Sequence, residues 1–242
     1  RRSLESSYRG LRVQEFAEDP ELCFRATGEC CFDVEAVERR FIQLREPVEL
    51  RRDGALQIWL PPIPGKEYII AVDTAGGGPE GDYAAVQVID LASGMQCAEL
   101  QQRLGTLELA RVAAALGREY GQLRAGALIA VERNNHGAGV LAYLDAVERY
   151  HRVYAQNGVT GWLTTAGSKP AMISRMGALL VESPWLVLSR RLLEECRTFV
   201  SYPGGKTGAA NGAHDDCLMA MALGQAVRAE VLQNGTRRER VH

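Results

Sequence analysis

The stretch that decides the fold is YIIAVDTAGGGPEGDYAAVQVID, residues 68–90. It opens with an apolar, β-branched run that ends in an acid, Asp73, and it continues through a glycine-rich turn into a second apolar run, residues 83–89. This pattern predicts a β-hairpin whose first strand is buried and carries a carboxylate at its end. A poorly solvated carboxylate needs a partner such as a cation. Other ligands of that cation should then lie elsewhere in the chain.

Length, composition and charge limit the possible classes of protein. The 242 residues permit one large α/β domain, or one domain with an appendage, and the 46% hydrophobic share is ordinary for a globular protein. The net charge of −2 requires any nucleic-acid binding to use a local basic face or metal ions. The six cysteines form no C-x-x-C pair, which argues against structural zinc and fits a reducing compartment. With no signal peptide and no apolar run near the ~18 residues that span a bilayer, we expect a soluble intracellular protein.

Three parts follow from the composition along the chain. Residues 1–55 carry many charges of both signs and one amphipathic helix, capped by Asp33, so we expect a loosely packed lead-in or linker. The PPIPG run at 61–65 breaks regular structure near the start of the main domain, which we assign to residues 56–232. Residues 233–242 are polar and basic and should form a flexible tail. The chain does not begin with Met, which suggests a fragment of a longer protein.

The order of predicted elements indicates an α/β fold. A β-meander is followed by a helix, a buried strand and further helices, which predicts a mixed sheet flanked by helices, with parallel pairing across the intervening helix. We expect residues 203–212 to be a flexible loop and residues 185–188 a strand or turn. The other predicted strands are 95–103, 125–131 and 153–156, and the predicted helices are 106–120, 139–150, one beginning near 168–170, 192–202 and 213–227.

Acidic residues recur at the ends of predicted elements. Asp73 and Glu132 each end a buried strand, and the pair Asp215–Asp216 opens an apolar helix after a glycine-rich loop. Strand ends meet at one edge of an α/β sheet, so these carboxylates can lie together. Clustered carboxylates raise one another's pKa unless a cation compensates, and Mg²⁺ or Mn²⁺ prefers such oxygen ligands. Two such ions about 4 Å apart can stabilise the attacking and leaving oxygens of a phosphodiester.

Each acid alone also has a purely structural explanation. A strand-end Asp often forms a turn, and an Asp at a helix start often serves as an N-cap. The set as a whole favours a metal site, with Asp73 on the central strand as the bridging ligand. Asp82, across the turn from Asp73, is either a further ligand or a solvated turn residue.

Polar side chains near the acids are candidates for substrate binding. Asn134 and His136 follow Glu132, and His214 precedes the two aspartates, so each could contact a phosphate or orient a ligand, or serve the fold alone. Lys169 at a polar helix start and Lys206 in the glycine-rich loop could contact phosphates, or could be solvated surface lysines. The chain has no G-x-x-x-x-G-K-[ST] motif, so we expect no P-loop ATPase.

Four segments together resemble the C-terminal nuclease domain of the large terminase subunits of tailed bacteriophages. They are IIAVDTAGGGPEGDYAAVQVID (69–90), LIAVERNNHGAGVLAYL (128–144), GWLTTAGSKPAMI (161–173) and GAHDDCLMAMALG (212–224). The resemblance runs over residues 68–227, and the lead-in at 14–33 is similar to the segment that joins the family's ATPase domain to its nuclease. It implies an RNase H-like fold and metal-dependent endonuclease action on double-stranded DNA, cutting concatemeric phage genomes during packaging.

The resemblance also implies roles and partners. The family's three acids match Asp73, Glu132 and the Asp215–Asp216 pair, with Asp216 favoured as the main ligand, and the cofactor would be Mg²⁺ or Mn²⁺, as two ions. The expected partners are double-stranded DNA, the ATPase domain missing here, the small terminase subunit and the portal protein, in the host cytoplasm and without a membrane.

Three other readings compete with the terminase nuclease. The first is another RNase H-like enzyme, such as a junction resolvase or transposase. The second is a non-catalytic DNA-docking module of a packaging motor. The third, an actin-like or sugar-kinase-like nucleotide binder, would need a second phosphate hairpin, which the sequence lacks.

Overall fold

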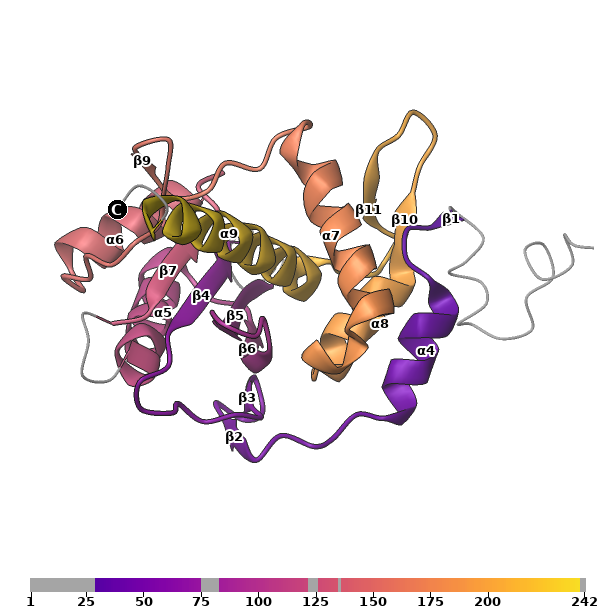
Figure 1. The fold of residues 1–242 in the computed structure, drawn as a ribbon, viewed down its shortest axis with the longest axis horizontal. Coiled ribbons are helices and arrows are strands. Elements are labelled where there is room, and N and C mark those ends of the chain that lie inside the picture. The colour runs from indigo at the N-terminus through magenta and orange to yellow at the C-terminus, as the bar shows by residue number, and fades with distance from the viewer. Residues whose placement is uncertain (1–28, 75–82, 122–125, 135, 240–242) are drawn as a thin grey trace, which may run out of the picture.

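The computed structural model describes residues 29–74, 83–121, 126–134 and 136–239 (Figure 1). Its main sheet has six strands in the order β2-β3-β6-β5-β4-β7. β4 pairs parallel with β7, whereas the other neighbours are antiparallel, so the predicted mixed sheet is confirmed. The strands are β2 (Glu49–Arg51), β3 (Leu56–Ile58), β4 (Tyr68–Asp73), β5 (Ala84–Asp90), β6 (Gln96–Gln102) and β7 (Leu128–Val131).

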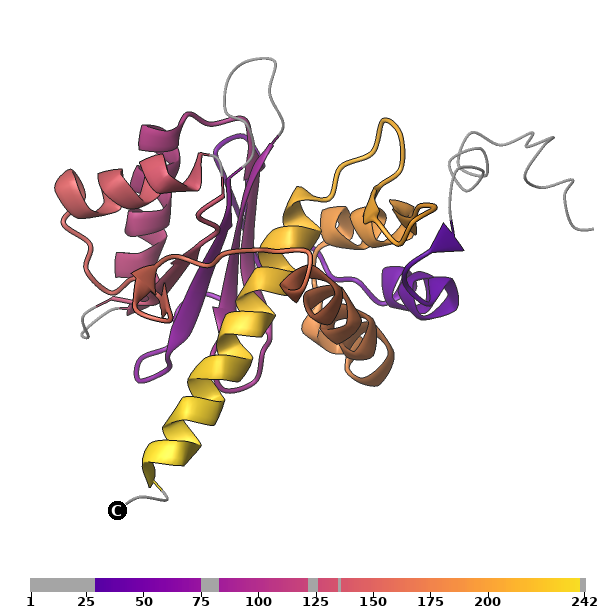
Figure 2. The ribbon, with the colours of Figure 1, turned by 90° about the horizontal axis from the view of Figure 1, so that it is seen from above.

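Helices cover both faces of this sheet (Figure 2). α5 (Thr106–Gly121) and α6 (Gly137–Ala146) lie on one face, and the long α9 (Asp216–Glu239) crosses the other. Beyond α9 pack α4 (Val34–Ile42), α7 (Ser168–Glu182) and α8 (Arg190–Thr198), with a short 3₁₀ turn, η2 (Pro184–Leu186), between the last two. Smaller strands are β1 (Glu29–Cys30), β10 (Phe199–Ser201) and β11 (Thr207–Ala209), which form a second sheet, and the β8 (Ala155–Gln156) and β9 (Val159–Thr160) hairpin.

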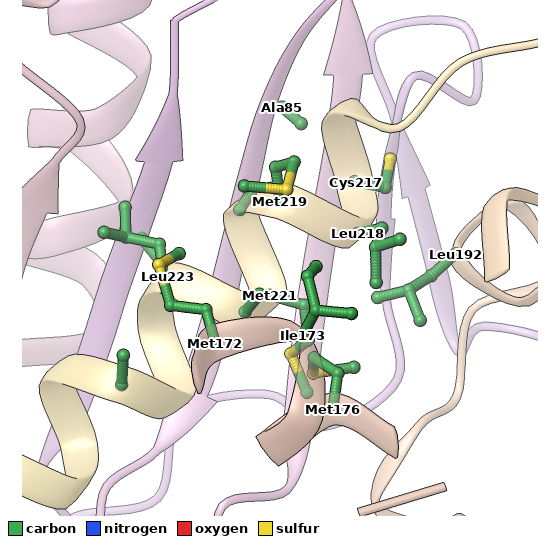
Figure 3. Packing of buried hydrophobic residues seen from close by; sticks show 14 of the residues in the cluster. Ala85, Met172, Ile173, Met176, Leu192, Cys217, Leu218, Met219, Met221 and Leu223 are labelled. Carbon is green, nitrogen blue, oxygen red and sulfur yellow. The ribbon is translucent and has the colours of Figure 1, made fainter. Parts of the chain in front are cut away.

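The alternation of side chains along β4 divides the core into two layers. Ile69 and Ala71 pack with α9, whereas Ile70 and Val72 pack with α5 on the opposite face. All four side chains are fully buried, which explains why β4 reads as a continuous apolar run. Figure 3 shows the α9 layer, where sulfur-containing and aliphatic side chains of α7, α8 and α9 interdigitate.

The opening hairpin forms as the sequence predicts. β4 and β5 pair antiparallel from Tyr68 opposite Asp90 to Asp73 opposite Ala85. Asp73 is therefore the last residue of a central strand, at the end nearest the turn. The glycine-rich turn itself, including Asp82, lies outside the described residues.

The lead-in does not pack loosely, contrary to our expectation. Its helix α4 is capped as predicted, because Asp33 Oδ1 accepts a hydrogen bond of 2.9 Å from the Ala36 N–H. However, Val37 is fully buried in the α9-side core, and β2 pairs with β3 as the edge of the main sheet. Residues 29–55 are therefore part of the same packed domain as residues 56 onwards, through apolar burial and through edge pairing.

Three further expectations were wrong in their boundaries. The helix expected over 192–202 ends at Thr198, and part of the expected loop at 203–212 is β11, paired with β10. Buried Phe199 and Val200 favour a strand, and Gly204 and Gly205 supply the positive φ of the intervening turn. At the C-terminus, α9 continues through the expected tail to Glu239. Within the described residues, no helix has both the length and the apolar composition needed to cross a bilayer.

α9 approaches the sheet closely at Gly224. A Cβ there would lie 2.3 Å from Ile89 Cδ1 and 3.0 Å from Ala71 Cβ. At Gly177, inside α7, a Cβ would meet only Phe32, at an ordinary 3.8 Å. Both glycines lie inside helices, but only Gly224 has neighbours too close to accept a Cβ.

We predict opposite effects for alanine at these two glycines. Gly177→Ala should raise the free energy of unfolding by up to about 1 kcal/mol, through helix propensity. Gly224→Ala should lower it by about 1 kcal/mol, because overpacking costs more than the helix gains. Urea denaturation of both variants checks this, and equal shifts would contradict the close packing of α9 on β4 and β5.

Candidate metal centre

Asp73 and Glu132 lie side by side at the ends of neighbouring parallel strands. Val72 pairs with Val131, and the Glu132 N–H continues the ladder with a 3.0 Å hydrogen bond to the Val72 carbonyl. The register therefore brings the two following acids to the same edge of the sheet, close enough that, besides burial, Glu132 raises the pKa of Asp73. This is the convergence that the sequence predicts for acids at strand ends.

The start of α9 adds Asp216, and Asp215 just before it, to this edge. α9 packs along β4 and β5, and Asp216 is only 8% exposed. Burial, the neighbouring Glu132 and the charges of Asp216 and Asp215 together hold the pKa of Asp73 well above its ordinary value. Four acids from three elements thus share one electrostatic environment.

The donor set fits a divalent cation. All four groups offer carboxylate oxygens, which hard cations such as Mg²⁺ and Mn²⁺ prefer, and their mutual repulsion would be relieved by positive charge. Across the described residues, no three His, Cys, Asp or Glu side chains already converge in the geometry of a bound ion. The fit therefore rests on the chemistry of the donors and on the raised pKa of Asp73.

Asn134 forms a hydrogen bond to Glu132. Its Nδ2 donates to Glu132 Oε1 at 3.2 Å and to the Thr164 carbonyl at 3.1 Å, so it links the acid to the segment that precedes α7. Behind this link, α6 begins so close to β7 that a Cβ on Gly137 would lie 1.7 Å from the Glu132 carbonyl oxygen. The local backbone and Asn134 together fix where Glu132 points.

The other predicted substrate contacts have different surroundings. His214 Nδ1 is 3.8 Å from Asp216 Oδ2, whereas His136 is exposed at the start of α6. Lys169 Nζ donates to the Thr207 carbonyl at 3.2 Å, and Lys206 is exposed in the turn between β10 and β11. The same hairpin adjoins the acids, since a Cβ on Gly208 would lie 4.0 Å from Asp215 Oδ2.

Sequence reasoning missed three residues near the site. The Tyr83 ring packs edge-on against His214, with centroids 5.1 Å apart, and the Arg103 guanidinium lies 4.6 Å from the Tyr83 centroid. The antiparallel pairing of β5 and β6 would have placed Tyr83 and Arg103 at one edge. Glu195 carried no such signal, because an acid in an amphipathic helix normally faces solvent. It is 6% exposed, and burial, with Glu99, Asp216 and Asp215, raises its pKa to about 9 despite a hydrogen bond from the Leu218 N–H.

Comparison with solved structures identifies the fold. The large terminase nuclease from the thermophilic phage G20c, with bound magnesium, superposes with a TM-score of 0.60 at 20% identity, covering 82% of this chain and 97% of that one. The large terminase nuclease domain of Thermus phage P74-26 gives 0.56 at 21% identity, covering 78% and 93%. The human cytomegalovirus terminase nuclease domain, soaked with Mn, gives 0.50 at 14% identity, covering 82% and 95%.

This chain has the large terminase nuclease fold. The expectation of an RNase H-like mixed sheet flanked by helices is thereby confirmed. Neither protein-family models nor curated protein sequences give a match. The terminase nuclease fold covers most of the chain.

The raised pKa of Asp73 predicts a pH-dependent cost to stability without metal. The folded state holds this proton more tightly than the unfolded chain, so stability falls as the pH rises above the unfolded value of about 4. In EDTA at pH 8, Asp73→Asn should therefore raise the free energy of unfolding by about 1 kcal/mol or more, with the gain vanishing towards pH 4. Chemical denaturation at both pH values measures this.

Asp145→Asn is the matched control, since this aspartate side chain is 79% exposed. It should change stability little at either pH. An Asp73→Asn variant no more stable than wild type at pH 8 would contradict the electrostatic crowding at this site.

Proposed function

We propose that this chain is the nuclease domain of a phage large terminase and hydrolyses phosphodiester bonds in double-stranded DNA with Mg²⁺ or Mn²⁺. The observation that carries the proposal is the meeting of Asp73, Glu132, Asp215 and Asp216 at one edge of this fold. Solved nucleases with the same fold carry bound magnesium, cobalt or zinc.

The four acids would hold two ions between them. Asp73 lies between Glu132 and the start of α9, so it is suited to bridge both ions. Glu132 and Asp216 would each complete one side, with Asp215 adjoining. When bound, the ions would stabilise the negative charge that develops on the phosphodiester during hydrolysis. Asp82 remains a proposed further ligand that would approach from the turn.

The surrounding polar residues would bind and orient the substrate. Asn134 holds Glu132 in place through its hydrogen bond and would also contact the substrate. His214 and His136 would contact the phosphodiester near the acids. Lys169 and Lys206, on or beside the β10–β11 hairpin, would contact neighbouring phosphates and offset the chain's negative net charge locally.

The proposed biological role is cutting concatemeric genomes during packaging. In this role the domain would act in the host cytoplasm as part of a longer chain with an ATPase domain, together with the small terminase subunit and the portal protein. A junction resolvase is the alternative with a related sheet and acids. Preference for a four-way junction over linear duplex or plasmid would favour it, whereas DNA binding without any cleavage would favour a docking module.

Plasmid digestion tests the proposed activity. Wild type should nick and linearise supercoiled plasmid with Mg²⁺ or Mn²⁺ but not with EDTA. Asp73→Asn and Glu132→Ala should each lower the rate by roughly 1,000-fold or more, because each removes a ligand of the ions that stabilise the transition state. Asp145→Asn should cleave like wild type.

Circular dichroism and thermal unfolding would verify that the variants fold. Mn²⁺-dependent nicking retained by folded Asp73→Asn would overturn the assignment of this residue as a metal ligand.

A further inference from the structure

Glu195, a buried acid on α8, holds the first turn of α9, which begins at Asp216 directly after Asp215. Glu195 Oε2 accepts a 2.8 Å hydrogen bond from the Leu218 N–H. Leu218 is the third residue of α9, so its N–H has no partner within the helix. Figure 3 shows the same turn packed against α8, with Leu218 facing Leu192.

The other oxygen of Glu195 connects this helix to the sheet row that carries Asp73. Gln101 Nε2 donates to Glu195 Oε1 at 2.9 Å. Gln101 pairs with Ala85, and Ala85 pairs with Asp73, so the three residues lie in one row across β6, β5 and β4. Glu195 thus links the row that contains Asp73 to the turn that contains Asp216.

Gln87 and Glu99, which lie opposite each other on β5 and β6, support the same turn. Gln87 Nε2 donates to the Cys217 carbonyl at 3.2 Å and to Glu99 at 2.9 Å. Glu99 in turn accepts a 2.6 Å hydrogen bond from Ser189 Oγ, which precedes α8. Buried polar groups destabilise a fold unless they are hydrogen-bonded. Here their hydrogen bonds connect the sheet, α8 and the start of α9.

We propose that Glu195 is a positioning residue for the metal centre, which fixes Asp215 and Asp216 relative to Asp73 through the Leu218 N–H and Gln101. This inference rests on the proposed function, because positioning matters only if the acids bind ions. Outer residues that orient metal ligands commonly contribute 10–100-fold to metal affinity. An apolar residue of similar size would fill the same space on α8 without accepting either hydrogen bond.

The test compares Glu195→Leu with Glu195→Gln and with Glu194→Leu. Glutamine keeps an oxygen for the Leu218 N–H, and Glu194 is the exposed neighbour on the same helix. Two quantities are measured: hydrogen exchange of the Leu218 amide in EDTA, and Mn²⁺ affinity by titration calorimetry. Glu195→Leu should speed the exchange roughly tenfold and weaken Mn²⁺ binding roughly tenfold or more. Glu195→Gln should stay near wild type, and Glu194→Leu should change neither quantity.

Stability separates positioning from damage to the fold. Glu195→Leu leaves the Leu218 N–H and Gln101 Nε2 without their acceptor, so it should unfold at a lower denaturant concentration than wild type while staying folded in buffer. If it does not fold, Gln101→Leu provides the same test, with a smaller loss of Mn²⁺ affinity, roughly threefold.

The outcomes are distinct. If wild type binds Mn²⁺, and Glu195→Leu leaves either the Leu218 exchange rate or the Mn²⁺ affinity unchanged, the positioning role alone is overturned. A wild type that binds no Mn²⁺ would overturn the proposed function, and the role of Glu195 with it, even if Leu218 exchange rises in Glu195→Leu.

Discussion

The repulsion among four carboxylates at one edge of the sheet is the constraint on which this structure depends. Asp73 and Glu132 are adjacent because β4 and β7 are parallel and in register, and Asp216 joins them because α9 begins at the same edge. Like charges placed this close repel one another unless a cation compensates them. The rest of the fold must therefore supply the free energy that keeps the acids together.

That free energy comes from apolar packing on both faces of β4. Its side chains alternate between the α5 layer and the α9 layer, and the strand is buried up to the residue before Asp73. α9 lies close to the sheet because Gly224 leaves room for Ile89 and Ala71. The acids are thus held by rigid elements whose packing is already satisfied, which is the arrangement that a precise ion site requires.

The sequence predicts the parts of this site that depend on local pattern. Apolar runs ending in Asp73 and Glu132, and an apolar helix opened by Asp215 and Asp216, are visible without a structure, because strand ends converge by topology. The β10–β11 hairpin and the burial of the lead-in depend on contacts between distant segments, such as β1 with β10. Glu195 is the clearest case, since its burial results from α8 packing against α9 and leaves no periodic signal in the sequence.

The central claim is that these four acids bind divalent cations, and anomalous diffraction from Mn²⁺-soaked crystals tests it most directly. The account predicts anomalous peaks within coordination distance of Asp73, flanked by Glu132 and by Asp216 or Asp215, which would also identify the main ligand of that pair. Ordered Mn²⁺ found only elsewhere on the surface, with none near Asp73 and Glu132, would contradict it.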